Sequence, residues 1–424
     1  MLANGRRTVV VCKWQAEILS SLLDCGAGVY MVLDRYDLRH EDLDEELLDR
    51  CLGVYRVGSF DSLEELSGVA VDIRLRDREV DLVIGHGELC QFGAGYLGVL
   101  LGTVADPLFP VSHRDKRLMK QRVRDAGAPV TGFMSLPDAT DRAAVAAVAE
   151  ALTMPVIVKP AAGYGSMSTV RAKDAEELAA VTADFTFEPL LNSKQLIVEE
   201  FVTGSELCVD AIWADGEPLT FVLHQYHTPR LAIADDEDAA SMDGSRVLLP
   251  EEHPDLVRQA REIHRRINGV LGIKEGATHM ETFIRPNGEL VFSEIATRVS
   301  GGWIPDMLSA HLGHSIWGLV GRAAATGTCP PPDRKHRYVA GVHLRPEKPG
   351  VITSIPSDEE FASFPGVISW RCSRKVGDRV RLSHPSEWYL FVVFGAETPE
   401  ELEELRVRVA RRFVIETAVP AARR

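Results

Sequence analysis

The chain has 424 residues, of which 45% are hydrophobic and 26% charged, and its formal net charge is −15. This length is enough for two or three domains, and the composition is that of a globular protein rather than a fibre or a disordered chain. The acidic balance argues against broad binding to nucleic acid or to an anionic membrane surface. No segment approaches the 18 uninterrupted apolar residues of a membrane span, so we expect a soluble protein without nucleic-acid or membrane partners.

The cysteines indicate the cellular compartment. There are seven of them, they are dispersed, and no two form a Cys-x-x-Cys pair. An odd, scattered set is typical of reduced, buried thiols. We therefore expect a cytoplasmic location.

The first ~110 residues alternate apolar strand runs with helical segments. The runs at 7–12, 28–33 and 80–85 are predicted strands, and 15–23 is a predicted helix. Such alternation predicts a parallel, doubly wound sheet. Residues 93–98 match the dinucleotide pattern G-x-G-x-x-G, but they lie inside an apolar helix and not at a strand-to-helix turn, so we do not predict a nucleotide site there.

Two lysines stand out in the next part of the chain. Lys116 opens a predicted helix over 114–126, and Lys159 ends an apolar strand directly before a glycine-rich loop. A strand-end cation followed by free loop amides can hold phosphate groups. The alternative is a surface lysine beside a flexible loop.

A strand over 196–202 is followed by a break and by Glu206. The interruption is expected to leave main-chain groups free at Glu200–Val202, where they can contact the edge of a purine. Glu206 can accept hydrogen bonds from ribose hydroxyls. Acidic turns of this kind are common, so the segment alone is weak evidence.

The strongest signal is a predicted β-hairpin over 279–298 with a two-residue turn at Asn287-Gly288. Counting from that turn places Glu281 opposite Glu294, Phe283 opposite Phe292 and His279 opposite Ala296. Directly opposed residues have Cβ atoms about 4.5–5.5 Å apart, and two carboxylates there repel unless one is protonated or a cation lies between them. Mg²⁺ suits such hard oxygen ligands and completes its shell with phosphate and water. The alternative is an exposed hairpin with two solvated glutamates.

Arg298 favours the metal interpretation, because a fixed cation beside two carboxylates completes an anion-handling site. His224 and His227 do not indicate zinc, since residues three apart on a strand point to opposite faces and no third ligand is evident. The chain contains neither a Walker A motif nor Gly-x-Ser-x-Gly.

Beyond the hairpin we expect an amphipathic helix over about 304–321 and a proline-rich linker at 329–333. Further strands are predicted at 337–344, 350–355 and 388–394, with a charged helix at 399–413. The chain is accordingly divided into an N-terminal α/β domain (1–111), a central domain (112–328) and a small β-rich C-terminal domain (329–424).

Taken in order, these elements resemble the ATP-grasp superfamily over about 112–325, and the hairpin most resembles its L-amino acid ligase branch. The resemblance implies an α/β ATP-grasp fold with a two-lobed central domain and a flexible lid at about 153–206. It implies that ATP is bound by Lys116 and by residues of the lid segment itself, namely Lys159, Gly163, Gly165, Ser166, Glu199, Glu200, Val202 and Glu206. Glu281 and Glu294 would hold two Mg²⁺ ions, for which Mn²⁺ can substitute, while Arg298 and His279 would act in catalysis. Ala296 departs from the pattern, because many relatives carry an asparagine ligand there.

The implied reaction joins a small-molecule carboxylate to an amine through an acyl-phosphate, with ADP and phosphate as products. Biotin carboxylase-like and purine-pathway ligases share the fold, and an ATP-binding module without catalysis is a further alternative. The sequence does not identify the substrates, since their pocket is expected in scattered loops such as 224–246 and 301–307. Similar proteins are often homodimers, and the oligomeric state is left open.

Overall fold

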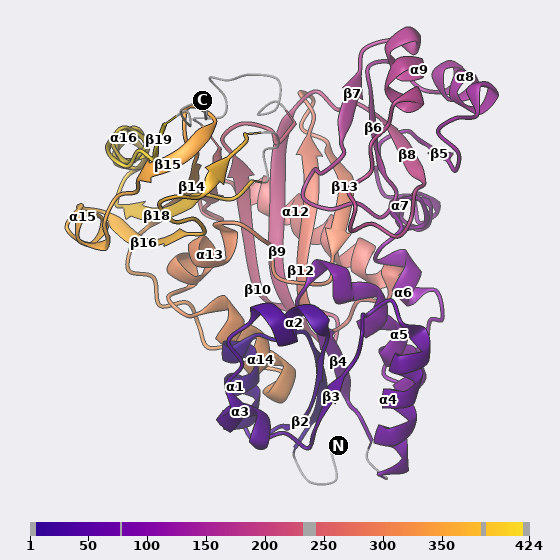
Figure 1. Ribbon diagram of the computed structural model, residues 1–424, viewed down its shortest axis with the longest axis vertical. Helices are drawn as coiled ribbons and strands as arrows, with labels where there is room; N and C mark the ends of the chain where they lie inside the picture. Colours follow the sequence, from indigo (N-terminus) through magenta and orange to yellow (C-terminus); the bar gives the residue numbers. More distant parts are fainter. Residues whose placement is uncertain (1–5, 77–78, 232–242, 383–386, 419–424) are drawn as a thin grey trace, which may run out of the picture.

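The computed structural model describes residues 6–76, 79–231, 243–382 and 387–418. Within them the N-terminal part forms a parallel four-stranded sheet in the order β3-β2-β1-β4 (Figure 1, bottom). Its strands are β1 (Thr8–Cys12), β2 (Gly28–Leu33), β3 (Gly53–Arg56) and β4 (Leu82–Gly85). Strand β3 was not predicted, because its four residues show little alternation.

Helices cover both faces of this sheet, as a doubly wound arrangement requires. Val9 and Val11 pack with α1 (Ala16–Asp24) and α14 (Ile316–Thr326). Val10 and Cys12 face the opposite side, against α4 (Leu63–Leu75) and α5 (Gln91–Leu101). Alternate side chains of one strand therefore enter two separate cores. The short helices α2 (Arg35–His40) and α3 (Glu45–Asp49) complete this part.

The glycines of the G-x-G-x-x-G match lie within α5, and close packing explains them. A Cβ at Gly93 would lie 2.4 Å from the Phe60 carbonyl oxygen, and one at Gly95 would lie 3.0 Å from the Pro110 Cα. The glycines thus allow neighbouring backbone to approach the helix. This agrees with the prediction that the motif is not a nucleotide site.

The centre of the molecule is an eight-stranded sheet in the order β13-β12-β9-β10-β11-β14-β18-β16. All its pairs are antiparallel. Its strands are β9 (Ser205–Ala214), β10 (Glu217–Tyr226), β11 (Gly244–Leu248), β12 (Gly276–Ile284), β13 (Leu290–Ala296), β14 (Tyr338–Leu344), β16 (Val367–Cys372) and β18 (Leu390–Ala396). The sheet crosses the predicted boundary at 328/329, because the C-terminal strands pair onto β11.

One face of this sheet packs on α7 (Lys116–Asp125) and α12 (Pro254–Leu271) through a core that includes Val209, Met280 and Phe292. Alternate residues of the same strands face the N-terminal part and the cavity described below. A three-stranded sheet, β17-β15-β19, lies beside the C-terminal strands with α15 (Asp358–Ala362) and α16 (Pro399–Arg412). Its strands are β15 (Gly350–Ser354), β17 (Arg379–Val380) and β19 (Glu416–Ala418).

A separate antiparallel sheet projects from the central sheet (Figure 1, upper right). It has the order β5-β8-β6-β7 and carries α8 (Arg142–Ala151) and α9 (Ala175–Ala183). Its strands are β5 (Phe133–Leu136), β6 (Val156–Pro160), β7 (Val170–Ala172) and β8 (Leu196–Glu200). An independent small core fills the space between this sheet and its helices.

The hairpin differs from the prediction in its turn, although its central pair is as predicted. The Arg285 N–H donates to the Glu289 carbonyl and Gly288 has φ +83°, so the loop has three residues rather than two. Phe283 consequently pairs with Val291 and not with Phe292. A bulge at Ser293 then restores the register, so Glu281 still faces Glu294 and His279 still faces Ala296.

The predicted helix over 304–321 is in fact two helices, α13 (Ile304–Leu312) and α14. They are separated by Gly313, which has φ +73° and would clash with the Asp333 carbonyl if it carried a Cβ. The apolar periodicity continues across this break, which is why the pattern alone suggested one helix.

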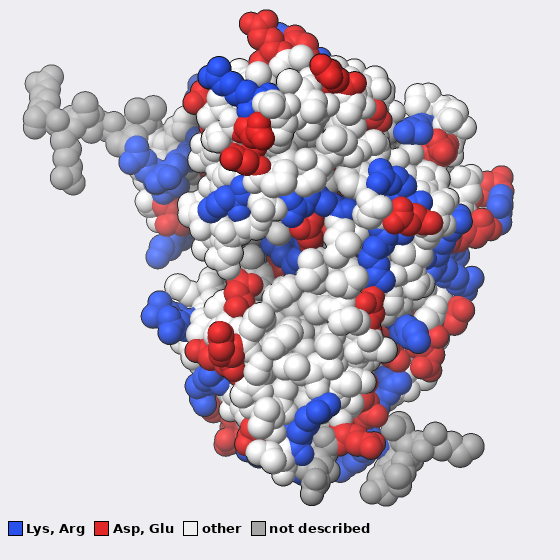
Figure 2. Space-filling view, turned by 90° about the vertical axis from the view of Figure 1, so that its right-hand side faces the viewer, with Lys and Arg blue, Asp and Glu red and all other residues white. Residues whose placement is uncertain are grey.

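The seven cysteines are all free thiols, as expected. Within the described ranges no helix has both the length and the hydropathy to cross a bilayer. Lysine and arginine side chains are interspersed with aspartate and glutamate on the face shown in Figure 2.

Candidate active site

A cavity of about 630 Å³ lies where the small projecting sheet, the central sheet and the N-terminal part meet. All the residues proposed from sequence as ATP, metal or catalytic residues line it. They come from segments as far apart in the chain as α7, β8 and the β12–β13 hairpin. The cavity has two ends, one rich in charged side chains and one rich in aromatic side chains.

The charged end is built on the facing glutamates of the hairpin. Glu281 and Glu294 are directly opposite on β12 and β13, and their side chains are 28% and 24% exposed. Lys116 Nζ and Lys159 Nζ each lie 3.4 Å from Glu294 Oε2. Burial opposes ionisation of Glu294, yet these lysines lower its pKa to about 2. The repulsion expected between the two carboxylates is therefore offset, at Glu294, by fixed ammonium groups.

A second group of ion pairs lies next to the Glu281/Glu294 pair. Glu199 on β8 is buried, 3.2 Å from Lys159 Nζ and 3.3 Å from Lys120 Nζ. Lys120 on α7 is fully buried and also donates to Thr131 Oγ1 at 2.9 Å. Burial lowers the pKa of Lys120 to about 8. The sequence analysis missed Lys120, although its place one helical turn after Lys116 was a usable signal.

The glycine-rich loop between β6 and β7 covers one side of the charged end. Gly163, Gly165 and Ser166 all line the cavity, and the Gly163 carbonyl accepts a 2.6 Å hydrogen bond from Lys116 Nζ. Gly165 and Ser166 have φ values of +58° and +56°. Successive residues in this left-handed region turn main-chain groups to one side, which is a geometry suited to an anion.

More backbone N–H groups at the end of β8 are hydrogen-bonded within the protein than predicted. The N–H groups of Glu200 and Phe201 donate to the carbonyls of Gly132 and Pro155, so they are not free to contact a purine. The Glu200 carboxylate accepts from the Thr153 N–H at 3.0 Å. Among the described residues, the Val202 N–H has no such partner, and Val202 lines the cavity.

Glu206 lies at the start of β9, almost fully buried on the cavity wall. Its Oε2 accepts a hydrogen bond from the Arg230 N–H at 2.8 Å. Burial and the nearby charge of Glu281 raise the pKa of Glu206 to about 8. A hydroxyl-rich ligand at this position would supply the donors that a buried carboxyl group requires.

Arg298 follows β13 and joins the two ends of the cavity. Its Nε and Nη2 both lie 2.5 Å from Glu88 Oε2. Glu88 also accepts from Arg114 Nη1 at 2.6 Å. Burial opposes ionisation of Glu88, but Arg298 and Arg114 hold its pKa below the usual value. Glu88 was missed from sequence, although it follows β4 at the carboxyl edge of the parallel sheet, where ligand-binding residues concentrate.

The aromatic end is formed by residues that the sequence analysis did not single out. They are His86, Tyr226, Trp303, Trp317 and Trp388, with Arg230 among them. The Arg230 guanidinium lies 5.7–5.9 Å from the ring centres of Tyr226, Trp303 and Trp388 and is paired with Asp243. Both predicted specificity loops contribute to this end, 301–307 through Trp303 and 224–246 through Tyr226 and Arg230; residues 232–242 lie outside the described residues.

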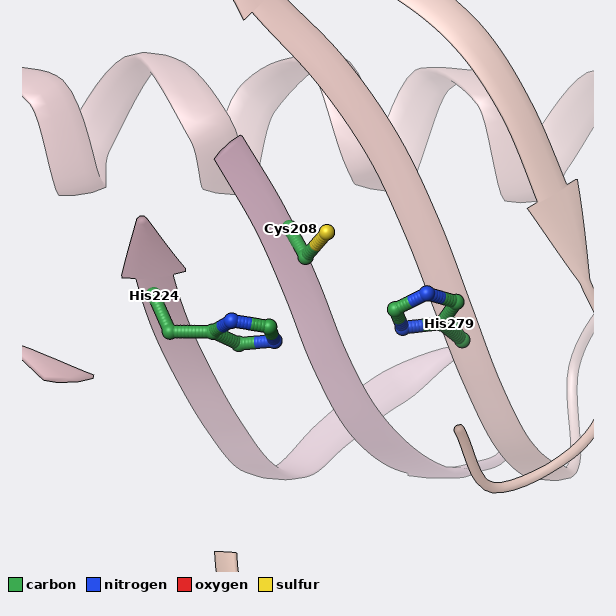
Figure 3. A group of neighbouring side chains, drawn as sticks. All are labelled: Cys208, His224 and His279. Carbon is green, nitrogen blue, oxygen red and sulfur yellow. The ribbon is translucent and has the colours of Figure 1, made fainter. Parts of the chain in front are cut away.

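His279 faces the charged end from β12, with Nε2 3.5 Å from Glu281 Oε1. Its neighbour across the sheet is His224, whose ring centre is 6.3 Å away, and not His227. Figure 3 shows the two imidazoles on either side of β9, with Cys208 between them. His227 lies just beyond the end of β10 and is not part of this group.

Comparison with known proteins agrees with this geometry. The family model for the ATP-grasp domain matches residues 152–306, and the model for L-amino acid ligase C-terminal domain 2 matches residues 342–418. The chain thus contains an ATP-grasp domain, and it has the predicted α/β fold.

Within that class the chain resembles the L-amino acid ligases. It is 24% identical over 367 residues to the L-arginine-specific L-amino acid ligase of Bacillus subtilis, covering 85% of this chain and 86% of that protein. The D-alanine–D-alanine ligase of Kineococcus radiotolerans is 32% identical over 194 residues, covering 43% of this chain and 50% of the relative. The structure of an L-amino acid ligase from Bacillus licheniformis has the same fold, with a TM-score of 0.72, 16% identity and coverage of 97% and 99%.

The relatives are ligases, and the protein is an ATP-grasp ligase that forms carbon–nitrogen bonds. Its general activity is ATP-dependent ligation of a carboxylate to an amine. ATP-grasp ligases use ATP and Mg²⁺, and the charged end of the cavity has the oxygen and ammonium groups that both require.

Proposed function

We propose that this protein joins two small amino-acid-like molecules through an amide bond, using an acyl-phosphate intermediate. The observation that carries the proposal is the continuity of the cavity. Two carboxylates faced by lysines lie at one end and an aromatic wall lies at the other, with the Glu88–Arg298 pair between them. A triphosphate and an amino acid can therefore meet within a single enclosed space.

At the charged end we assign the triphosphate to Lys116, Lys159 and the loop residues Gly163, Gly165 and Ser166. The adenine would lie against Glu199, Glu200 and Val202, with the ribose on Glu206. Support comes from Lys116, which bridges the loop and Glu294, and from Lys159, which contacts the same glutamate. We further propose that residues 153–206 form the lid over the phosphates, and that 1–111, 112–328 and 329–424 are the three domains.

Glu281 and Glu294 are our candidates for holding two Mg²⁺ ions, with Mn²⁺ able to replace them. Their partly exposed oxygens point into the cavity, which fits a hard divalent cation. When bound, the ions would supply positive charge that neutralises the phosphoryl group being transferred. Ala296 offers no oxygen, so phosphate and water would complete the shell at that position.

In the reaction, a substrate carboxylate oxygen attacks the γ-phosphorus and the bond to ADP breaks, giving an acyl-phosphate. The nitrogen of the second substrate then attacks the acyl carbon, loses a proton and displaces phosphate. Arg298 is placed to hold the negative oxygens at the reacting centre, and His279 lies beside Glu281. A carboxylate is a weak nucleophile, so positioning and charge neutralisation provide most of the rate enhancement.

The test is phosphate release from MgATP with L-amino acids supplied singly and in pairs, coupled to mass detection of the product. We expect release that depends on an amino acid and a product whose mass equals the two substrates less one water. Release that requires bicarbonate with free biotin, or a phosphoribosyl amine with an acid, would contradict the proposal in favour of the two related enzyme classes. ATP binding without turnover on any substrate would favour a binding module.

A further inference from the structure

A buried hydrogen-bonded group lies behind His279 on the same face of the central sheet. Asp210 on β9 is 5% exposed, and its Oδ1 lies 3.1 Å from His279 Nδ1. Its other oxygen, Oδ2, lies 2.8 Å from His224 Nε2. One carboxylate therefore binds two imidazoles, one from each neighbouring strand.

The strand register explains this contact. Asp210 is directly opposite His279 on β12, while His224 on β10 is opposite Cys208, two residues away on the same face of β9. The rings consequently flank β9 from both sides (Figure 3). Of these residues, only His279 lines the cavity; Asp210 and His224 lie behind it.

The contacts also determine which ring nitrogens carry hydrogen. An ionised carboxylate only accepts hydrogen bonds, so His279 Nδ1 and His224 Nε2 must both donate to Asp210. This leaves Nε2 as the His279 atom that faces Glu281 and the cavity. Rotation of the ring, or movement of the hydrogen to the other nitrogen, would break the bond to Asp210.

We propose that Asp210, held in turn by His224, is a positioning residue that fixes His279 with Nε2 directed at Glu281 and the groups that react beside it. The inference rests on the ligase function proposed above. It resembles the general arrangement in which a carboxylate sets the tautomer and orientation of a histidine in a functional site.

The same side chains allow a competing interpretation as a metal site. Cys208, His224 and His279 each offer a ligand atom, and these atoms lie within 4.8 Å of one another. A thiolate with imidazoles would favour zinc or a similar ion. Both interpretations keep the Asp210 hydrogen bonds at 2.8–3.1 Å, because a metal-bound histidine also donates its other ring N–H to a carboxylate. Metal analysis of the purified protein therefore distinguishes them.

The first test is Asp210→Asn, which keeps the shape of the side chain but replaces one acceptor oxygen with a donor. We expect kcat to fall roughly 10- to 100-fold, with KM for ATP changed by less than about two-fold. A double-mutant cycle then separates positioning from an independent role. Because Asp210 acts through His279, Asp210→Asn combined with His279→Gln should be no slower than His279→Gln alone. Additive losses, or a stable Asp210→Asn protein with wild-type kcat, would overturn the proposal.

The control is Thr278→Val, on the opposite face of β12. Thr278 belongs to an equally buried polar group, in which it accepts from Trp213 Nε1 at 2.8 Å and lies 3.0 Å from His264 Nε2. Its loss should lower the melting temperature without changing kcat. A general loss of sheet stability would instead affect kcat in both variants.

A conservative pair keeps the test informative if Asp210→Asn does not fold. His224→Gln retains an N–H near the position of Nε2, whereas His224→Leu removes it. We expect His224→Gln to keep a higher kcat than His224→Leu, and equal activities would contradict the proposal.

A measurement independent of turnover distinguishes failure of this inference from failure of the proposed function. Nitrogen-15 NMR of the metal-free protein should show His279 with hydrogen on Nδ1, and this signal should change in Asp210→Asn. A His279 signal that does not respond to Asp210→Asn would overturn the proposal even if the enzyme is an active ligase. Stoichiometric zinc in the purified protein that is lost in Cys208→Ser, or a cobalt–thiolate absorption band, would overturn it in favour of the metal site.

Discussion

The two ends of the cavity are built in different ways. At the charged end, Lys159, the glycine-rich loop and the Glu281/Glu294 hairpin are each short, local sequence features, and their side chains are tied together by ion pairs. At the other end, Arg230, Trp303 and Trp388 come from distant segments and meet only in the folded chain. On the function proposed above, phosphate chemistry is specified locally, whereas substrate choice depends on how the parts of the chain assemble.

The largest effect is expected at the candidate metal ligands Glu281 and Glu294. Glu294→Gln removes the charge that holds both lysines and a candidate Mg²⁺ ligand, so turnover should fall by about 10³-fold or more. Mg²⁺-dependent ATP binding, measured by calorimetry, should weaken in parallel. The matched control is Glu289→Gln beside the hairpin loop, where the carboxylate pairs with the partly exposed Arg285. Wild-type turnover in Glu294→Gln would contradict the metal assignment.

Glu88→Gln tests the connection between the two ends. The substitution leaves Arg298 without a carboxylate partner, and breaking one side of a desolvated pair typically costs 2–5 kcal/mol. We expect kcat/KM for the amino-acid substrate to fall about 100-fold, while KM for ATP is retained. Glu275→Gln is the control, because its pair with Arg7 is equally half-buried but does not line the cavity. Equal losses in both variants would show that Glu88 matters only for stability.

Trp388→Ala tests the aromatic end. Loss of this wall should raise KM for the amino-acid substrate roughly tenfold, because burying an aromatic or aliphatic side chain contributes about 1.5–3 kcal/mol. Competition assays should also show a changed order of preferred amino acids, with ATP kinetics unaltered. Trp370→Ala is a control in the same part of the chain, since Trp370 stacks on Phe361 away from the cavity. An unchanged order of preferred amino acids in Trp388→Ala would show that Trp388 does not determine substrate specificity.

The smallest effect concerns the free energy of unfolding, which is lowered by burial of the Lys120 ammonium group at the charged end. Burial lowers the pKa of Lys120 to about 8, below that of an unfolded lysine. Between these two pKa values the unfolded chain binds more protons, so the free energy of unfolding should rise with pH from about 8 to 10. Relative to Lys120→Met, the wild type should gain about 1–3 kcal/mol over that range in denaturant titrations. A pH-independent difference between the two would contradict the shifted pKa.

The hairpin shows how much of the site could be predicted from the sequence. The pairing of Glu281 with Glu294 was predicted correctly, but through a two-residue turn that the structure does not have. The three-residue loop shifts the register by one, and the bulge at Ser293 shifts it back. A local turn signal identifies a hairpin, whereas bulges depend on packing against the neighbouring strand β9 and are not visible in the pattern.

Residues that act through tertiary contacts could not be predicted in this way. Asp210 is a buried charge whose partners, His224 and His279, come from other strands, so neither spacing nor hydropathy reveals it. The spacing of Lys120 from Lys116 was a usable signal, but its pairing with Glu199 was not visible in the sequence. The prediction of free N–H groups at Glu200 and Phe201 was wrong for the same reason. The carbonyl oxygens of Gly132 and Pro155 accept hydrogen bonds from these two groups. The fold class itself was predictable, because alternating strand and helix runs are long and regular.

The most direct test of the account is product analysis with the wild-type enzyme, MgATP and pairs of L-amino acids. The account predicts ADP, phosphate and a dipeptide in equal amounts, with phosphate release dependent on the amino-acid substrates. Phosphate release without any amide product, or amide formation only from substrates that are not amino-acid-like, would contradict it.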